Sequence, residues 1–266
     1  MLIDRLKNGI MSRLAQVIYP PRLSFVIACC ALWLSVASAA GAIMHKPSNV
    51  IDGDTLVLQG GTVIRLLGIN APEIAHHGQP AEQGGWRAKQ YLKTILAEQS
   101  VYLQYDAERK DRYGRTLAQV FLANGVHLNA EMLRHGMATL SIHPPNMQYL
   151  DALQAAQSAA EDRHRGVWSL PSHRLQPIAT LKQGNSWGRF VGRVSRIRQT
   201  KKGSQLYLGD RHYIWVAASA YRYFPALETY SGRLLEVRAW PKKWGKAWSL
   251  RVIHPSQIIL KPNEGG

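Results

Sequence analysis

The sequence predicts an α+β domain followed by a smaller all-β domain, and three observations support this fold class. Strand-like runs open the first part of the chain, and helical patterns are interleaved with its later strands. The last third instead alternates apolar and polar residues with period two. Charge divides the chain at the same place, since residues 41–179 hold 13 Lys and Arg against 12 Asp and Glu, whereas residues 180–266 hold 16 against 4. Such asymmetry indicates two domains with different roles.

Residues 1–44 are predicted to be a targeting segment. Basic residues up to Arg22 precede an almost uncharged stretch at 23–44, which ends in small residues of the type that signal peptidases accept. The stretch is also long enough to cross a bilayer, so it is either a cleaved signal peptide or a membrane anchor. Both alternatives place the folded part outside the cytoplasm, secreted, periplasmic or extracellular. Cys29 and Cys30, the only cysteines, lie in this segment, which excludes a disulfide from the rest of the chain.

Residues 45–170 are predicted to form the α+β domain. Two glycines, Gly60 and Gly61, join the first two strands as a hairpin. Gly136 and Gly166 follow the second and third helices, where a glycine commonly ends a helix. Strands are expected at 55–58, 63–67, 101–105 and 116–122, and helices at 82–97, 128–135 and 147–163. This order suggests a small barrel buttressed by helices.

After a linker at 171–180, residues 181–262 are predicted to form a basic β-rich domain. Strands are expected at 235–240 and 248–253, with a basic hairpin loop at 242–246 between them. Twelve of the chain's 23 aromatic residues follow Leu181, interleaved with Lys and Arg, a combination that single-strand-binding proteins use. We therefore expect Lys242 and Trp244 to bind nucleic acid, and Trp215 and Trp248 to lie in the core.

Three short segments hold polar residues that hydrophobic patterning does not explain. They read Val-Ile-Asp-Gly-Asp-Thr at 50–55, Arg-Leu-Leu-Gly-Ile-Asn-Ala-Pro-Glu at 65–73, and Asp-Arg-Tyr-Gly-Arg-Thr-Leu-Ala at 111–118. Taken singly, they are explained as turns and solvated hairpins. Together they supply what phosphodiester hydrolysis needs: oxygen ligands for a hard cation, a carboxylate to activate water, and guanidinium groups to stabilise charge at phosphorus.

In order, spacing and flanking residues, the three segments resemble the staphylococcal nuclease family from Val50 to Trp168. The resemblance implies an oligonucleotide/oligosaccharide-binding (OB) type barrel with helices, Ca²⁺ as cofactor, and DNA and RNA as substrates. It further implies that Glu73 activates water and that Arg65 and Arg115 neutralise the pentacoordinate phosphorane. The residues it implies as metal ligands are Asp54, Asn70 and the carbonyl of Ala71, and those that hold phosphate are Arg112 and Tyr113.

One residue departs from the family pattern. The family's second calcium-binding carboxylate falls at Asn70, an amide, so the predicted site loses one negative charge. Because ligand charge is a main determinant of calcium affinity, we expect binding in the millimolar range. The sequence thus predicts an exported calcium-dependent nuclease. The alternatives are a nucleic-acid-binding protein with a decayed site, and a basic domain that only localises the chain to an anionic envelope.

Overall fold

The computed structural model describes residues 43–75, 80–182, 184 and 186–262. The predicted targeting segment at 1–44 therefore lies outside the described residues, apart from Ile43 and Met44. No helix within the described ranges is long and apolar enough to cross a membrane.

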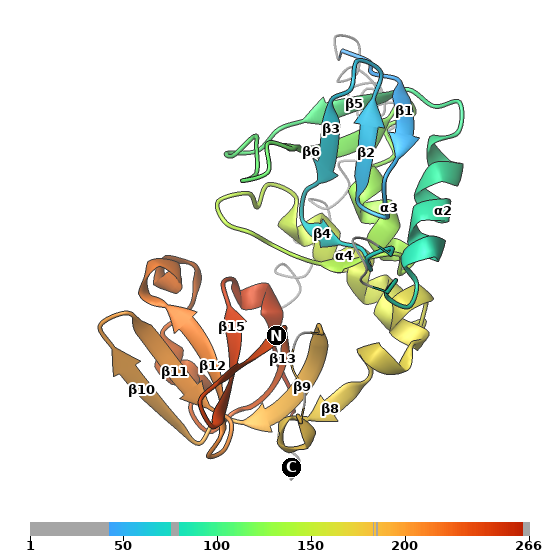
Figure 1. Cartoon of the computed structure of the whole chain (residues 1–266). Helices are drawn as coiled ribbons and strands as arrows, with labels where there is room; N and C mark the ends of the chain where they lie inside the picture. The colour runs from blue at the N-terminus through green and yellow to red at the C-terminus, as the bar shows by residue number, and fades with distance from the viewer. Residues whose placement is uncertain (1–42, 76–79, 183, 185, 263–266) are drawn as a thin grey trace, which may run out of the picture. The chain divides into compact units, whose positions relative to one another are not determined.

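The first domain contains a five-stranded sheet in the order β1-β2-β3-β6-β5 (Figure 1). Neighbouring strands are antiparallel except β3 and β6, which run parallel. This parallel pairing places the start of β6 beside β3, and both strands carry predicted site residues or adjoin them. The strands are β1 (Pro47–Val50), β2 (Thr55–Leu58), β3 (Val63–Leu66), β5 (Val101–Gln104) and β6 (Thr116–Leu122), and β4 (Ile69–Asn70) pairs with β7 (Thr139–Leu140) as a separate ribbon.

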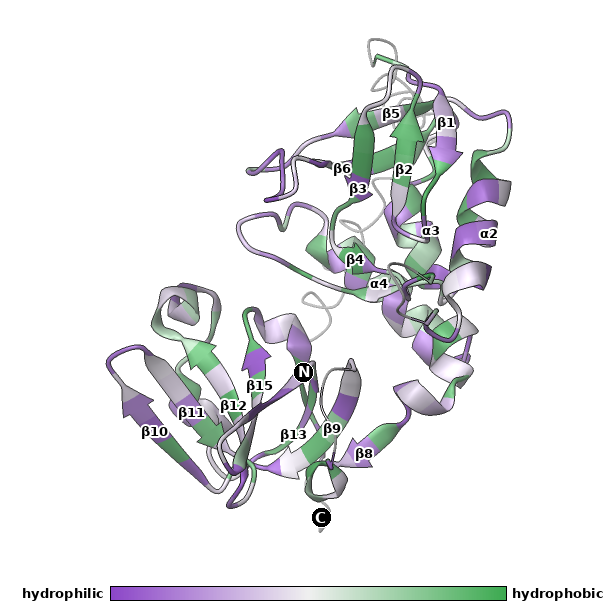
Figure 2. Ribbon diagram, in the orientation of Figure 1, coloured by the Kyte–Doolittle hydropathy of each residue, from purple (hydrophilic) through white to green (hydrophobic). Residues whose placement is uncertain are grey.

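Three helices complete this domain: α2 (Gly85–Leu96), α3 (Leu128–Arg134) and α4 (Leu150–Glu161). Each buries one apolar face, for example Ala88 and Leu92 of α2, in the core that the strands also line. Figure 2 shows hydrophobic residues along β2, β3 and β6 and hydrophilic residues on α2, as expected for buried strands and a one-sided helix. The three predicted helices are confirmed, each somewhat shorter than expected.

The mixed α+β class is confirmed, but the strand pairing does not describe a closed barrel. Among the described residues, β1 and β5 are the edges of the five-stranded sheet, and only an isolated bridge between His45 and Val101 joins the segment before β1 to β5. The sheet is therefore open. Alternation of apolar residues specifies which face of a strand is buried, whereas closure depends on how edge strands meet, which alternation does not encode.

Residues 175–260, which we call the second domain, form two open sheets that share one apolar core. Leu206, Ile214 and Leu250 of one sheet and Leu235 and Val237 of the other belong to this core and are fully buried. One sheet has the order β10-β11-β12-β15-β14 and the other β16-β13-β9-β8. The strands are β8 (Leu175–Pro177), β9 (Gly188–Arg193), β10 (Arg196–Thr200), β11 (Gly203–Tyr207), β12 (His212–Ala217), β13 (Leu234–Ala239), β14 (Pro241–Trp244), β15 (Ala247–Val252) and β16 (Ile258–Leu260). Short 3-10 helices lie at Gly166–Ser169, Pro171–His173, Ile178–Thr180, Ala218–Tyr223, Leu227–Tyr230 and Pro255–Gln257.

Two segments of the second domain differ from the sequence prediction. The expected linker at 171–180 contains β8, which pairs in parallel with β9, so this sheet begins inside the linker. The prediction of a loop at 242–246 is wrong for residues 242–244, which belong to β14 and pair with β15. Only Gly245 and Lys246 form the turn. Consecutive lysines suggested a loop, but an edge strand accepts them because its ladder needs only backbone groups.

Candidate functional site

Asp54 lies directly before β2 and is 4% exposed. Its Oδ1 accepts a hydrogen bond from the hydroxyl of Thr55 at 3.1 Å, and its Oδ2 accepts one from the backbone N–H of Ala71 at 2.6 Å. The Nη1 of Arg65 forms an ion pair with the same Oδ2 at 2.9 Å. Three groups therefore fix this carboxylate between β2, β3 and the end of β4.

Burial raises the pKa of Asp54 to about 7, because desolvation penalises the charged form. The positive charge of Arg65 opposes this rise, whereas the negative charge of Asp52 adds to it. Asp52 is also buried, and its Oδ1 accepts a hydrogen bond from the backbone N–H of Asp54 at 3.0 Å. A nearby cation stabilises the ionised form of a buried carboxylate, and for Asp54 the guanidinium of Arg65 provides this positive charge.

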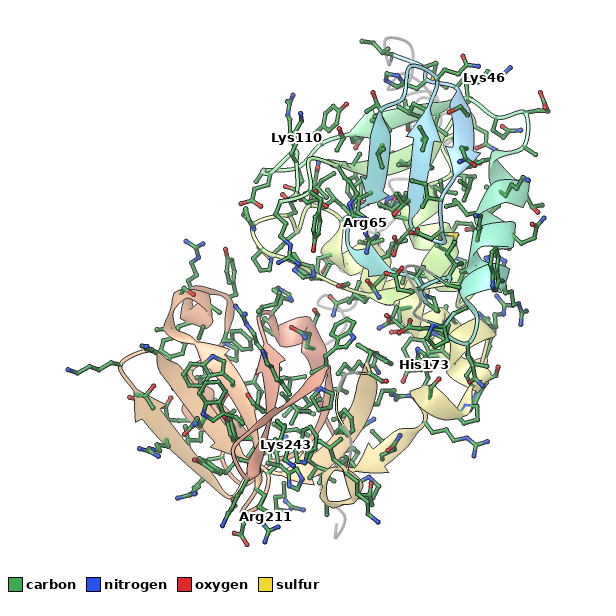
Figure 3. All side chains as sticks on the ribbon, in the orientation of Figure 1. Lys46, Arg65, Lys110, His173, Arg211 and Lys243 are labelled. Carbon is green, nitrogen blue, oxygen red and sulfur yellow. The ribbon has the colours of Figure 1, made fainter. Side chains whose placement is uncertain are left out.

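Arg65 projects from β3, where it stands opposite Thr55 in the antiparallel register with β2. Besides Asp54, its guanidinium contacts the Oδ1 of Asn70 at 3.2 Å and the carbonyl oxygen of Leu66 at 3.1 Å. Figure 3 shows Arg65 among polar side chains near the end of β3. The guanidinium thus binds the side-chain oxygens of both Asp54 and Asn70, which were predicted to be metal ligands.

Arg115 directly precedes β6, the parallel neighbour of β3. Its Nε forms an ion pair with the Oδ2 of Asp111 at 2.7 Å. Burial on its own would raise the pKa of Asp111. Hydrogen bonds from the side chain of Arg115 and from two backbone N–H groups outweigh this effect and lower the pKa below its usual value. Tyr113 is 68% exposed, with the guanidinium groups of Arg112 and Arg115 at 4.7 and 5.6 Å from its ring centre. The turn thus presents two cations and one ring.

One cavity of about 500 Å³ brings most of these residues together. Site residues predicted from two separate sequence segments, 65–73 and 111–118, line this cavity. Asp54 does not line it, but it forms an ion pair with Arg65, which does. Convergence of the two arginines was predicted, and it follows from the parallel register of β3 and β6. The predicted residues that line the cavity are Arg65, Asn70, Arg112, Tyr113 and Arg115.

Glu73 does not line this cavity. It is exposed and lines a neighbouring cavity that shares Asn70 with the first. Its backbone is fixed, because its N–H donates to the Oε2 of Glu82 at 3.0 Å and its carbonyl accepts from the N–H of Glu82 at 2.8 Å. The structure therefore places Glu73 next to the two-arginine cavity, on the other side of Asn70.

The oxygen atoms near Arg65 suit a hard cation by type. Asp54 offers a carboxylate, Asn70 an amide oxygen, and Ala71 a backbone carbonyl whose oxygen lies 3.4 Å from the Nδ2 of Asn70. Calcium and magnesium take such ligands. Within the described ranges, however, no group of three or more His, Cys, Asp and Glu is placed to hold a metal. The donor set fits a calcium ion in chemistry and supplies little negative charge.

Sequence reasoning left out several polar residues that the fold brings to this region. Glu82 holds the backbone of Glu73, as described above. His143 and Lys110 line the cavity with Arg65, and burial together with nearby arginines lowers the pKa of His143. None of these residues stands in a motif, and only the tertiary fold reveals their proximity.

Lys242 and Trp244 are not part of this site. Both are exposed on β14 of the second domain and line a different cavity, about 620 Å³ in volume. Their proposed binding role therefore concerns a second surface.

The sequence similarity between this chain and known proteins lies mainly in the first domain. The family described as staphylococcal nuclease homologue matches residues 63–170, which include Arg65, Glu73 and Arg115. A thermonuclease from Staphylococcus hyicus is 33% identical over 135 residues, which are 50% of this chain and 79% of that protein. A thermonuclease from Staphylococcus intermedius is 35% identical over 123 residues, 45% of this chain and 73% of that protein. Endonuclease YhcR from Bacillus subtilis is 31% identical over 200 residues, which are 70% of this chain and 16% of that protein.

Proposed function

Because the chain belongs to the staphylococcal nuclease family, we propose that it is an exported nuclease that hydrolyses phosphodiester bonds of DNA, RNA or both with Ca²⁺. The observation that carries the proposal is the convergence of Arg65 and Arg115 on one cavity, with Asp54 held against Arg65. Two guanidinium groups that line one cavity are the donors that a phosphate with developing negative charge needs. The family relationship also supports an OB-type arrangement for the first domain.

In this proposal each candidate site residue of the first domain has a defined task. Arg65 and Arg115 bind the non-bridging oxygens of the phosphate and stabilise the charge that builds up on them. Glu73 takes a proton from the attacking water, and Arg112 and Tyr113 hold the neighbouring phosphate. Asp54, Asn70 and Ala71 would hold the calcium ion. When bound there, the ion would act as a Lewis acid on the phosphoryl oxygen.

Calcium binding in this site competes with an internal cation. The guanidinium of Arg65 lies 2.9 Å from the Oδ2 of Asp54 and 3.2 Å from the Oδ1 of Asn70, and these two side chains are also the ones that would hold calcium. With a divalent cation held there, charge repulsion would weaken the contacts of Arg65 and leave its guanidinium available to phosphate. This competition and the single carboxylate both support weak, millimolar calcium affinity.

Digestion of plasmid DNA and of a structured RNA tests the activity. We expect cleavage that requires calcium, stops with EDTA, and falls by at least about a hundredfold in Glu73→Gln, because the variant keeps the shape of the side chain and loses its basicity. Glu98→Gln removes the same charge at the end of α2, outside the site, and serves as the control. Saturation of the activity at micromolar calcium would contradict the predicted weak affinity.

A non-catalytic nucleic-acid-binding protein is the second candidate function. Two observations favour it. The predicted metal ligands include only one carboxylate, and Glu73 lies outside the two-arginine cavity. In that case both nucleic acids bind and neither is cut at any calcium concentration. The digestion described above therefore separates the two functions directly.

Export and the role of the second domain complete the proposal. We infer from the sequence that residues 1–44 direct the chain out of the cytoplasm, as a cleaved signal peptide or as a membrane tether at 23–44. Cell fractionation followed by N-terminal sequencing of the exported chain distinguishes the two, and a cytoplasmic location contradicts both. The basic domain at 181–262 is proposed to supply affinity for nucleic acid, while the first domain supplies the chemistry.

A further inference from the structure

The sheet β10-β11-β12-β15-β14 has one face in the core of the second domain. Leu206, Ile214 and Leu250, from three adjacent strands, are all 0% exposed and lie opposite one another in the strand registers. Because successive side chains of a strand point to opposite faces, their sequence neighbours lie on the other side of the sheet. On that second face, Gln205, Trp215 and Ser249 line an open cavity.

The strand registers show which residues share this second face. Tyr207 stands opposite Tyr213, and Trp215 stands opposite Arg251. On β14, Lys242 stands opposite Ser249, the neighbour of the buried Leu250, so Lys242 and Trp244 also lie on this face. We refer to Tyr207, Tyr213, Trp215, Lys242, Trp244 and Arg251 as the outer face.

Aromatic rings run across the outer face from covered to open positions. Tyr207 and Tyr213 are buried, with ring centres 5.7 Å apart, and the guanidinium of Arg196 lies 3.9 Å from the ring centre of Tyr207. Trp215 is half-buried, and Trp244 is 74% exposed. The prediction that Trp215 belongs to the core is wrong, because its side chain lines an open cavity with Trp244. A tryptophan as exposed as Trp244 contributes little to folding and is available to a partner.

The same cavity is rich in positive charge. Lys201 and Lys202, at the turn between β10 and β11, line it together with Lys242 and Arg251. None of the described residues that line it is acidic. Four cations in a cavity without a carboxylate attract a negatively charged ligand.

We propose that the outer face binds single-stranded nucleic acid. Bases stack on Trp244 and Trp215, and phosphates contact Lys201, Lys202, Lys242 and Arg251. The proposal rests on the proposed function only in its choice of polyanion, since a chain that cleaves nucleic acid meets it as substrate. Rings that lie beside unpaired cations match a ligand with planar faces and repeated negative charges, which is the chemistry of unpaired nucleotides.

A duplex and an anionic lipid surface are less suitable partners for this face. The bases of a duplex are stacked on one another, so the exposed ring of Trp244 has no base to contact unless the helix opens. A membrane surface attracts the lysines by charge but offers no planar group to the rings, and it does not distinguish Lys242 from its neighbour Lys243. Both partners are included in the test.

The experiment is a fluorescence anisotropy titration of the full chain with a labelled oligothymidylate of about 20 nucleotides, longer than the ~4–16 nucleotides that one OB fold covers. EDTA is present so that cleavage does not interfere. Trp244→Ala is expected to raise the dissociation constant about tenfold or more, because one stacking contact is lost. Lys242→Gln is expected to raise it several-fold and to reduce the slope of log affinity against log salt by about 0.7.

Matched controls decide whether the face itself is responsible. Lys243→Gln removes the same charge from the adjacent residue, which stands opposite Trp248 in the register and whose Nζ lies 5.9 Å from the centre of that ring, on the other face of the sheet. Trp86→Ala removes a 59% exposed tryptophan from the first domain. Both controls are expected to change the dissociation constant by less than about twofold. A duplex of equal length is expected to bind more weakly than the single strand at the same salt concentration.

Three results overturn the proposal: equal effects of Lys242→Gln and Lys243→Gln, no effect of Trp244→Ala, or binding to vesicles of anionic phospholipid that depends on Trp244 while oligonucleotide binding does not. Calcium-dependent cleavage by the unaltered chain is measured separately. If the chain cleaves but Trp244→Ala binds normally, the outer face is not the site and the nuclease function stands. If binding depends on Trp244 and no cleavage occurs, the face stands and the nuclease function fails.

Discussion

Substitution of Glu236 tests whether a buried carboxylate stabilises the second domain. Glu236 lies on β13, is 0% exposed, and accepts contacts from the Nε of Arg189 at 2.7 Å, the Nε of Arg238 at 2.8 Å and the Nζ of Lys261 at 2.7 Å. Burial alone would raise its pKa, but hydrogen bonds from Arg189 and Lys261 and the charge of Arg238 lower it from 4.5 to about 2. At about 1.36 kcal/mol per pH unit, this shift corresponds to about 3 kcal/mol of stability at neutral pH.

Glu236→Gln should therefore reduce the free energy of unfolding by about 3 kcal/mol at pH 7. Complete loss of partners from a buried charge costs about 3–5 kcal/mol, and the expected loss lies at the low end because Arg189 and Arg238 each keep a second carboxylate in Glu161. The pKa is lowered in the folded state, so the contribution is fully present above about pH 4.5 and is lost as the pH falls through about 2. The difference between the wild-type chain and the variant should shrink over this range.

Urea unfolding followed by tryptophan fluorescence measures this difference at pH 7 and at several values down to about pH 3. Glu228→Gln is the control, because Glu228 is an exposed carboxylate of the same domain and should change stability by less than about 0.5 kcal/mol. A loss below about 1 kcal/mol at pH 7, or one that is independent of pH, would show that the network does not stabilise the domain through the ionised carboxylate.

Two further substitutions test the predicted metal site and the helix ends. Asn70→Asp adds a carboxylate beside Asp54 and should tighten calcium binding by about tenfold or more, as measured by isothermal titration calorimetry; unchanged or weaker binding would contradict the role of Asn70 as a ligand. Gly136→Ala should destabilise the chain by more than about 2 kcal/mol in thermal unfolding, because Gly136 has a φ of 64° and an added Cβ would lie 2.1 Å from the carbonyl oxygen of Arg165. Gly125→Ala, with a φ of 83° and nothing within 4 Å of the added Cβ, should cost only about 1 kcal/mol and separates backbone strain from the clash; equal losses would refute the steric argument.

The convergence of the two arginines could be predicted because strands fix it. Arg65 lies on β3 opposite Leu117 of the parallel strand β6, so Arg115, two residues before Leu117, lies on the same side of the sheet. The position of Glu73 could not be predicted in the same way. It follows β4, a strand of two residues, and Pro72, in a segment where no periodicity sets the direction of the side chain. Motif spacing therefore indicated which residues belong to the region, and only the fold showed which of them share a cavity.

The outer face of the second domain shows why aromatic residues in a β-rich sequence resist assignment. Alternation separates Trp215 from Ile214 and Val216, but it does not say which of the two faces is covered. The missing information was the partner of β15. Once Pro241–Trp244 pairs with that strand, Lys242 and Trp244 extend the face that holds Trp215 and Arg251, and the rings and cations lie together. Interpreting 242–246 as a loop separated these groups, so the sequence did not reveal that Trp215, Lys242 and Trp244 share one face.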